Sequence, residues 1–203
     1  MTVAAAAVRR WRFGDDPAIV ARALARGAVV AIPTESSYGL AVDPRDAAAV
    51  ARLFALKGRG GEKALPVIVA DAAAVGALGV DADDPALRWA TPRWPAALSV
   101  VVRPAAPIAA ASADGTLAVR VPADERLRAL LAALGGPLTA TSANRSGEPP
   151  YLDPEPLAAW LESAGVDALV VDGGRLPGGP PSTLVAWRSG GPVVLRPGRV
   201  PIA

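Results

Sequence analysis

The chain is 203 residues long and 52% hydrophobic, which is enough to bury a core and predicts a single domain over residues 1–203, with its core at about 12–200. It contains no cysteine and no histidine, which excludes disulfides and thiolate metal sites and argues against zinc chemistry and Ser-His-Asp hydrolysis. The net charge is only +2, yet 19 of the 21 basic residues are arginine and the sequence pI is about 9.5, which suits an anionic partner such as a nucleotide or RNA.

The first part of the chain alternates helical and strand patterns. Residues 16–26 are predicted to form a helix, because Asp16-Pro17 is typical of a helix start and Gly27 of a helix end. The continuous apolar run 28–32 predicts a strand that is buried on both faces.

A second helix is predicted between Asp46 and Gly58. Asp46 is a suitable cap, and Val50, Leu53 and Lys57 follow at helical spacing. Lys57 is therefore expected in the last helical turn.

The rest of the chain continues this alternation. Strands are predicted in the apolar runs 65–70, 98–102, 117–121, 138–140, 169–171, 184–187 and 193–195, and helices near 71–78, 84–91, 124–134 and 154–164. Strands separated by helices predict an α/β fold, with a mixed sheet because the last strands have no helix between them. The turn-rich segment 173–181 is expected to be a loop beside a site.

Mean hydropathy is positive, at +0.32, but no apolar run reaches the roughly 18 residues of a membrane span. The short apolar N-terminus is followed by Arg9 and Arg10, which is the reverse of a signal peptide. A soluble, cytoplasmic protein with no membrane partner is therefore expected.

The segment 33–40, Pro-Thr-Glu-Ser-Ser-Tyr-Gly-Leu, directly follows the predicted buried strand. Ligands of α/β sheets bind beyond the carboxyl ends of strands, so these hydroxyls and the carboxylate are candidates for a binding site. The alternative is a polar turn.

The segment from Lys57 to Gly61 has two cations, Lys57 and Arg59, at a helix end and in a glycine-rich loop. Such cations are suited to polyphosphate, the arginine as a fork and the lysine as a point charge. Cations at this position also stabilise the helix dipole, which is the simpler interpretation.

The segment 139–147 presents Ser142 and Asn144 at the end of a short strand, where such side chains bind phosphate oxygens or a base edge but are also ordinary turn formers. Arg120 lies within an apolar run, where a charge needs a partner. That partner is either a substrate carboxylate or an acid in an internal salt bridge. The remaining alternative is an arginine that faces the edge of the sheet.

The chain has neither a P-loop nor a glycine-rich dinucleotide-binding motif. Its candidate segments instead resemble, in order, the YrdC/TsaC family of L-threonylcarbamoyladenylate synthases. The matching pieces are Ile-Pro-Thr-Glu-x-x-Tyr-Gly-Leu (32–40), Lys-Gly-Arg (57–59), Trp-Pro-x-x-Leu-Ser (94–99), Val-Arg-Val-Pro (119–122), Thr-Ser-Ala-Asn-x-Ser-Gly (141–147), Pro-Ser-Thr (181–183) and Leu-Arg-Pro-Gly (195–198).

The resemblance implies a YrdC-like fold, a twisted open sheet with flanking helices and a concave basic cleft, and it implies residue roles. ATP would be bound by Lys57, Gly61, Thr116, Ser142, Asn144, Pro150 and Arg196. L-threonine would be bound by Thr34, Tyr38, Arg59, Arg120, Ala140 and Ser182. Lys57 and Arg59 would be catalytic, Mg²⁺ would accompany ATP, and no protein metal site is expected.

The implied reaction joins L-threonine, bicarbonate or CO₂, and ATP into threonylcarbamoyl-AMP and pyrophosphate. A downstream threonylcarbamoyl transferase would then modify adenosine 37 of tRNA. No general base is assigned, although Glu35 is a candidate. Two readings remain open beside this one: a non-catalytic protein that binds tRNA or double-stranded RNA, and a carbamoyl-adenylate enzyme with another acceptor.

Three departures from the family pattern bear on loop closure and substrate choice. Ser36-Ser37 stands where Thr-Val is common, Gly60 stands where proline usually follows Lys-x-Arg, and the segment 65–69 lacks a histidine that many longer members carry. The chain also ends just after Leu-Arg-Pro-Gly, so it resembles the short form of the family.

Overall fold

The structure is a computed structural model that describes residues 7–58 and 64–202. Within these residues the helices are α1 (Ala18–Ala25), α2 (Ala47–Lys57), α3 (Pro85–Ala90), α4 (Glu125–Leu134) and α5 (Pro154–Ser163), with 3-10 helices η1 (Ala73–Leu78) and η2 (Thr91–Arg93). The strands are β1 (Val8–Arg12), β2 (Val29–Pro33), β3 (Tyr38–Ala41), β4 (Val67–Ile68), β5 (Leu98–Val102), β6 (Leu117–Arg120), β7 (Leu138–Thr139), β8 (Thr141–Ser142), β9 (Ala168–Asp172), β10 (Thr183–Arg188) and β11 (Gly191–Arg196).

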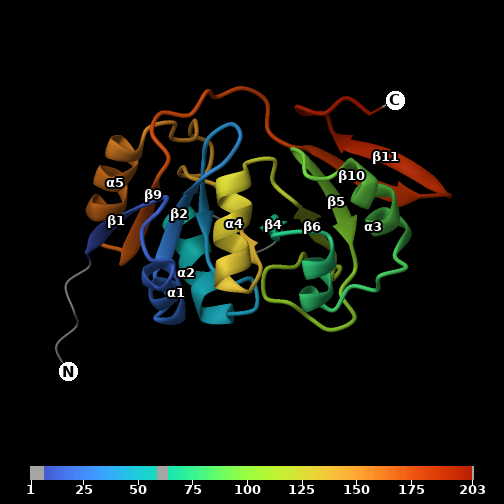
Figure 1. Cartoon of the computed structure of the whole chain (residues 1–203), viewed down its shortest axis with the longest axis horizontal. Coiled ribbons are helices and arrows are strands. Elements are labelled where there is room, and N and C mark those ends of the chain that lie inside the picture. The colour runs from blue at the N-terminus through green and yellow to red at the C-terminus, as the bar shows by residue number, and fades with distance from the viewer. Residues whose placement is uncertain (1–6, 59–63, 203) are drawn as a thin grey trace.

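The strands are divided between two mixed sheets that lie side by side along the long axis (Figure 1). The five-stranded sheet has the order β1-β9-β2-β3-β8, with parallel pairing on both sides of β9 and antiparallel pairing on both sides of β3. The six-stranded sheet has the order β11-β10-β5-β6-β4-β7 and also mixes the two kinds of pairing. The predicted mixed α/β class is therefore confirmed.

The two sheets meet where the chain passes from β7 to β8. Only Ala140 separates these strands, and they belong to different sheets. Thr139 is fully buried at this junction, where its hydroxyl accepts from Val42 N and donates to Leu40 O. The crossing fixes the position of one sheet against the other.

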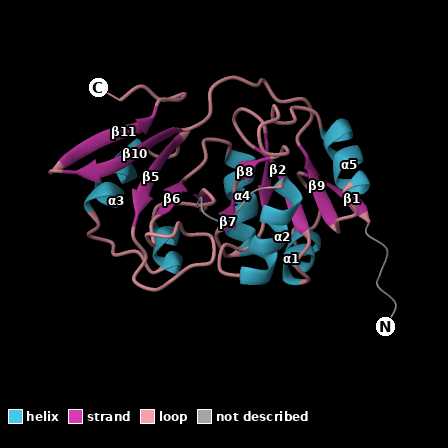
Figure 2. Ribbon diagram, turned by 180° about the vertical axis from the view of Figure 1, so that it is seen from behind, coloured by secondary structure: helices cyan, strands magenta, loops and turns pink. Residues whose placement is uncertain are grey.

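The helices cover the five-stranded sheet on both faces because β2 is apolar at every position. Val29 and Ala31 pack in one cluster with residues of α2 and α5, whereas Val30 and Ile32 pack in a second cluster with residues of α1 and α4. This alternation follows the two-residue period of a strand. The strand-only hairpin β10–β11 projects at the end opposite to α5 (Figure 2).

Helix α2 begins and ends where its sequence predicts. The Asp46 side chain accepts from Ala49 N at 3.0 Å as the N-cap, and Gly58 ends the helix in the left-handed region, at a φ of 60°. Glycine has no Cβ to clash in that region. Lys57 consequently lies in the last turn.

Three strands were not expected from the sequence, β1, β3 and β8. In addition, the predicted strand 65–70 is reduced to β4, and the predicted helix 71–78 is the 3-10 helix η1. In the described residues, no helix combines the length and apolar character needed to cross a membrane.

Candidate active site

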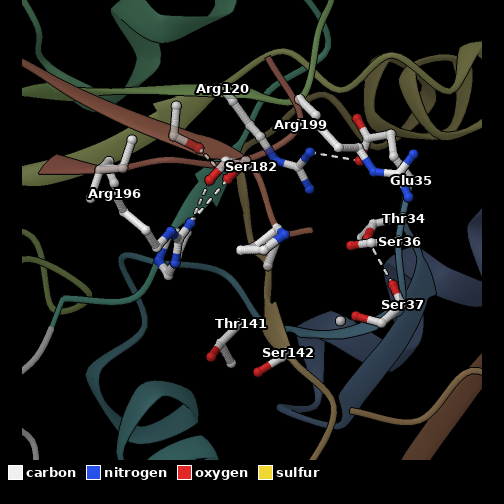
Figure 3. Close-up of a pocket in the computed structure, with 18 of the residues that line it drawn as sticks. Thr34, Glu35, Ser36, Ser37, Arg120, Thr141, Ser142, Ser182, Arg196 and Arg199 are labelled. Carbon is white, nitrogen blue, oxygen red and sulfur yellow. Dashed lines mark hydrogen bonds and ion pairs between the residues drawn. The ribbon is translucent and has the colours of Figure 1, made fainter. Parts of the chain in front are cut away.

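A cavity of about 570 Å³ lies at the junction of the two sheets. Its walls come from the loop between β2 and β3, from β5 and β6, from the β7–β8 crossing, and from the segments that flank the β10–β11 hairpin. Figure 3 shows polar side chains from the β2–β3 loop, from β6, from β8 and from both flanks of the hairpin around one space. Most of the candidate segments of the sequence therefore converge here.

The loop between β2 and β3 forms one wall. Its turn is held by Thr34, whose hydroxyl donates to Ser37 O at 2.7 Å. Tyr38 follows, fully buried, and its hydroxyl donates to Gly174 O and accepts from Gly173 N. Burial raises the pKa of Tyr38 above its usual value, so the phenol stays protonated and ties this loop to the chain that leaves β9.

Arg120 and Glu35 form an ion pair at the top of the cavity (Figure 3). Arg120 Nη1 donates to Glu35 Oε2 at 2.6 Å, and Ala123 N donates to Glu35 Oε1 at 2.8 Å. Burial alone would raise the pKa of Glu35, but the charge of Arg120 and the bond from Ala123 lower it below its usual value. Arg120 thus has the internal partner that the sequence left open, while it also lines the cavity.

The opposite wall is built around Ser182. Its hydroxyl lies 3.0 Å from Ser99 Oγ, and Arg196 Nη2 donates to Ser182 O at 2.8 Å. Partial burial, together with the positive charge of Arg120, lowers the pKa of Arg196. Arg199 also lines the cavity and donates to Gly178 O. Three arginines, Arg120, Arg196 and Arg199, therefore line this cavity.

Lys57 lies behind the cavity wall and does not line the cavity in the structure. Its side chain is buried, and Nζ donates to Ser142 O at 2.5 Å, to Asn144 O at 3.1 Å and to Asn144 Oδ1 at 2.9 Å. Asn144 Oδ1 also accepts from Ser142 Oγ at 2.7 Å. The ammonium group therefore fixes the segment that presents Ser142 to the cavity.

Thr116 contributes a hydroxyl on the side of β6. Thr116 Oγ1 donates to Asp114 Oδ1 at 2.7 Å, and Ser112 Oγ donates to the same oxygen. These hydrogen bonds, from Ser112 first and then Thr116, lower the pKa of Asp114 to about 2. The carboxylate therefore stays ionised and orients both hydroxyls.

The structure brings most of the predicted site residues together. Those that line the cavity are Thr34, Tyr38, Thr116, Arg120, Ala140, Ser142, Ser182 and Arg196. Lys57, Asn144 and Pro150 do not line it, and Arg59 and Gly61 lie outside the described residues.

Lining residues that were not among the predicted ligands include Ser99, Arg199 and Glu35. Ser99 and Arg199 adjoin matching motif pieces, at the end of Trp-Pro-x-x-Leu-Ser and just after Leu-Arg-Pro-Gly, which is the signal that points to them. Glu35 lies inside a matching piece and was considered only as a base.

Among the described residues, no group of three or more carboxylates has the arrangement of a metal site. The cavity lining is instead mainly hydroxyls and arginines, with Glu35 already bonded to two donors. This donor set is suited to anions.

Residues 22–198 match the family model of the Sua5, YciO and YrdC proteins, which carries the description "Telomere recombination". The threonylcarbamoyl-AMP synthase of Chromohalobacter salexigens is 40% identical over 182 residues, which cover 87% of this chain and 95% of that protein. The threonylcarbamoyl-AMP synthase of Bacillus subtilis is 35% identical, and the match covers 92% of this chain but only 55% of the longer relative.

A crystal structure of Pyrococcus abyssi Sua5 complexed with L-threonine superposes with a TM-score of 0.81 at 29% identity. The match covers 95% of this chain and 57% of the Pyrococcus chain. The overall fold is therefore shared with a solved structure.

Proposed function

The chain belongs to the Sua5/YciO/YrdC family, and from this membership we propose that it is an L-threonylcarbamoyladenylate synthase. It would use ATP, L-threonine and bicarbonate or CO₂ to form threonylcarbamoyl-AMP, with release of pyrophosphate. The observation that carries the proposal is the cavity, which gathers three arginines and several hydroxyls from both sheets into one space. The naming of relatives at 40% and 35% identity supports it.

The chemistry requires two anions to approach one another. The neutral amine of threonine would add to CO₂ and release a proton to solvent, which gives a carbamate. A carbamate oxygen would then attack the α-phosphate while pyrophosphate leaves. Negative charge accumulates on phosphate and is stabilised by fixed cations and hydrogen-bond donors. Arg196 and Arg199, which both line the cavity, would supply these cations.

The amino acid would lie between the loop after β2 and the segment before β10. Arg120 would receive the carboxylate through the N–H groups that do not face Glu35, because a guanidinium has five donors. Thr34, Tyr38, Ala140 and Ser182 would line this subsite. Holding both reactants in place contributes to the rate by proximity.

ATP would contact Ser142, Thr116 and Arg196, which line the same cavity. Lys57 and Asn144 would act through Ser142, since their polar groups bond to it and to each other. The expected contacts of Gly61 and Pro150 with ATP and of Arg59 with threonine, and a catalytic role of Arg59, remain predictions.

Mg²⁺ would arrive on the phosphates of ATP, because the described residues form no cluster of metal ligands. Magnesium commonly binds through substrate phosphates and waters in this way. Excess EDTA is therefore expected to stop pyrophosphate release, and added Mg²⁺ to restore it.

Further partners belong to the same proposal. The product would pass to a downstream threonylcarbamoyl transferase that modifies adenosine 37 of tRNA, in the cytoplasm, and direct binding of tRNA is a separate question. The arginine-rich composition is compatible with contact to RNA.

The deciding experiment is pyrophosphate release with ATP and Mg²⁺, with and without L-threonine and bicarbonate, together with mass detection of the adenylate. Release that depends on both co-substrates is the expected result. A protein that is inactive with ATP but binds tRNA would instead support the RNA-binding alternative.

A further inference from the structure

The cavity holds a carboxylate that an anion-binding site does not need. Glu35 is the one acidic residue among the described residues that line it, beside Arg120, Arg196 and Arg199. A negative charge at this position repels phosphate, bicarbonate and carboxylate alike. Its presence calls for a partner that is a hydrogen-bond donor.

Glu35 is fixed and ionised. Its two oxygens accept from Arg120 Nη1 at 2.6 Å and from Ala123 N at 2.8 Å, and only 13% of its side chain is exposed. The net lowering of its pKa keeps it unprotonated at neutral pH. A carboxylate in this state is a weak base but a strong hydrogen-bond acceptor.

The pair also has unused bonding capacity toward the cavity. A carboxylate has about four lone-pair positions, and a guanidinium has five N–H groups. Among the described residues, the Glu35 carboxylate accepts from Arg120 and from Ala123 N, and the Arg120 side chain donates to Glu35. Figure 3 shows the two side chains meeting at the cavity, next to Thr34. A cation and an anion thus lie side by side, as they do in an α-amino acid.

We propose that Glu35 is a specificity-determining residue, which accepts a hydrogen bond from the α-amino group of the substrate while Arg120 binds the α-carboxylate. The inference rests on the proposed function and deepens it, because it makes the Glu35–Arg120 pair a receptor for a zwitterion. In this role Glu35 acts as a hydrogen-bond acceptor and not as the general base. An N–H group remains on this nitrogen after carbamate formation, so the contact persists through the reaction.

The first test changes only the ligand. Binding of L-threonine, (3R)-3-hydroxybutanoate and L-threoninol to the wild-type protein is measured by calorimetry; the second ligand lacks the amine and the third lacks the carboxylate. Charge-assisted hydrogen bonds predict about tenfold or more weaker binding of each analogue. Binding of 3-hydroxybutanoate as tight as that of threonine would overturn the proposal without any variant.

The second test uses Glu35→Gln, with Glu155→Gln as the matched control. Glu155 pairs with Arg10 on the surface, away from the cavity. In Glu35→Gln, the preference for threonine over 3-hydroxybutanoate is expected to fall about tenfold, while the preference over threoninol remains. The control is expected to keep both preferences.

Two results would contradict the assignment. An unchanged amine preference in folded Glu35→Gln, checked by circular dichroism, means that Glu35 does not recognise the amine. Loss of both preferences together means that Glu35 only positions Arg120.

Pyrophosphate release by the same wild-type preparation separates this inference from the proposed function. A wild-type protein that neither binds threonine nor releases pyrophosphate overturns both. An active wild-type protein with an unselective amine subsite overturns the inference alone.

Discussion

At the scale of single residues, Lys57 shows how a predicted ligand can act from behind the site. Its ammonium has three N–H groups, and three oxygens of Ser142 and Asn144 accept from it. A buried acceptor that loses its donor costs about 1–3 kcal/mol. The lysine therefore contributes to both the stability and the shape of the cavity wall.

Lys57→Met is expected to lower the unfolding midpoint by several degrees and pyrophosphate release by at least a hundredfold, because Ser142 loses its support. Thermal melting and the pyrophosphate assay measure the two effects. Arg52→Met is the control, since it removes a cation from the same helix outside the cavity. Normal turnover in Lys57→Met would show that the network has no catalytic role.

Sequence alone could identify Arg120 as unusual but could not name its partner. An arginine in an apolar run requires a compensating charge, and the acid that provides it, Glu35, is 85 positions away in the chain. Lys57 and Ser142 are also far apart in the sequence, so the sequence could not show that they are in contact. The sequence motifs identified these residues, but the contacts between them depend on how the two sheets pack together.

At the scale of elements, the caps of two helices differ although both are aspartates. Asp124 at the start of α4 accepts from Arg126 N and Leu127 N, whereas Asp153 at the start of α5 makes no side-chain cap hydrogen bond. Capping hydrogen bonds satisfy backbone N–H groups that a helix leaves unpaired. Of these two helices, α4 gains this stabilisation and α5 does not.

Asp124→Ala is therefore expected to lower the free energy of unfolding by about 1 kcal/mol. Asp153→Ala loses only an exposed pair with Arg175 and is expected to cost a few tenths of that amount. Urea denaturation of both variants measures the difference. Equal losses would refute the assignment of the caps.

Gly198 packs directly against the segment that carries Ser182. A Cβ at this position would overlap the carbonyl oxygen of Pro181 and lie 2.5 Å from Thr183 N. Gly198→Ala must displace this backbone, so the KM for L-threonine is expected to rise at least tenfold.

The control for this prediction is Gly191→Ala, at the start of β11, the strand that precedes Gly198. Nothing lies within 4 Å of a Cβ placed there. Steady-state kinetics of both variants test the difference. A KM that does not change in Gly198→Ala would place Ser182 outside the threonine subsite.

Two of the strands that sequence reasoning missed, β1 and β3, have clear physical causes. β1 is an edge strand in which only Trp11 is buried, and its arginines hide the apolar pattern. β3 begins at Tyr38 immediately after a polar turn, so the run 33–40 resembles a loop. Long apolar runs such as β2 and β5 were predicted because burial on both faces is visible in composition.

At the scale of the whole molecule, the Glu35–Arg120 pair joins the two sheets across the cavity. Glu35 follows β2 of one sheet, and Arg120 ends β6 of the other. The pKa of Glu35 is lower in the folded chain than its usual value. Stability from this ionised pair is therefore full above the unfolded value of about 4.3 and is lost as pH falls through the folded value.

Glu35→Gln is expected to be about 1–3 kcal/mol less stable than wild type at pH 7. The difference is expected to shrink as the pH falls below the usual carboxyl pKa and through the lowered pKa of folded Glu35, because wild-type Glu35 then takes up its proton. Urea denaturation of both proteins between pH 7 and 3 measures it. A difference that is independent of pH would show that the charge of Glu35 does not link the sheets.

The order of strands in the five-stranded sheet also bears on how the protein is made. β9 pairs with both β1 and β2, yet it is synthesised more than a hundred residues after them. A chain emerging from the ribosome therefore carries two unpaired strand edges for most of its synthesis. The cavity forms later still, because Ser182, Arg196 and Arg199 lie near the carboxyl end (Figure 1). Translation that stops early leaves an exposed apolar strand and no site, which makes incomplete chains targets for chaperones and proteolysis.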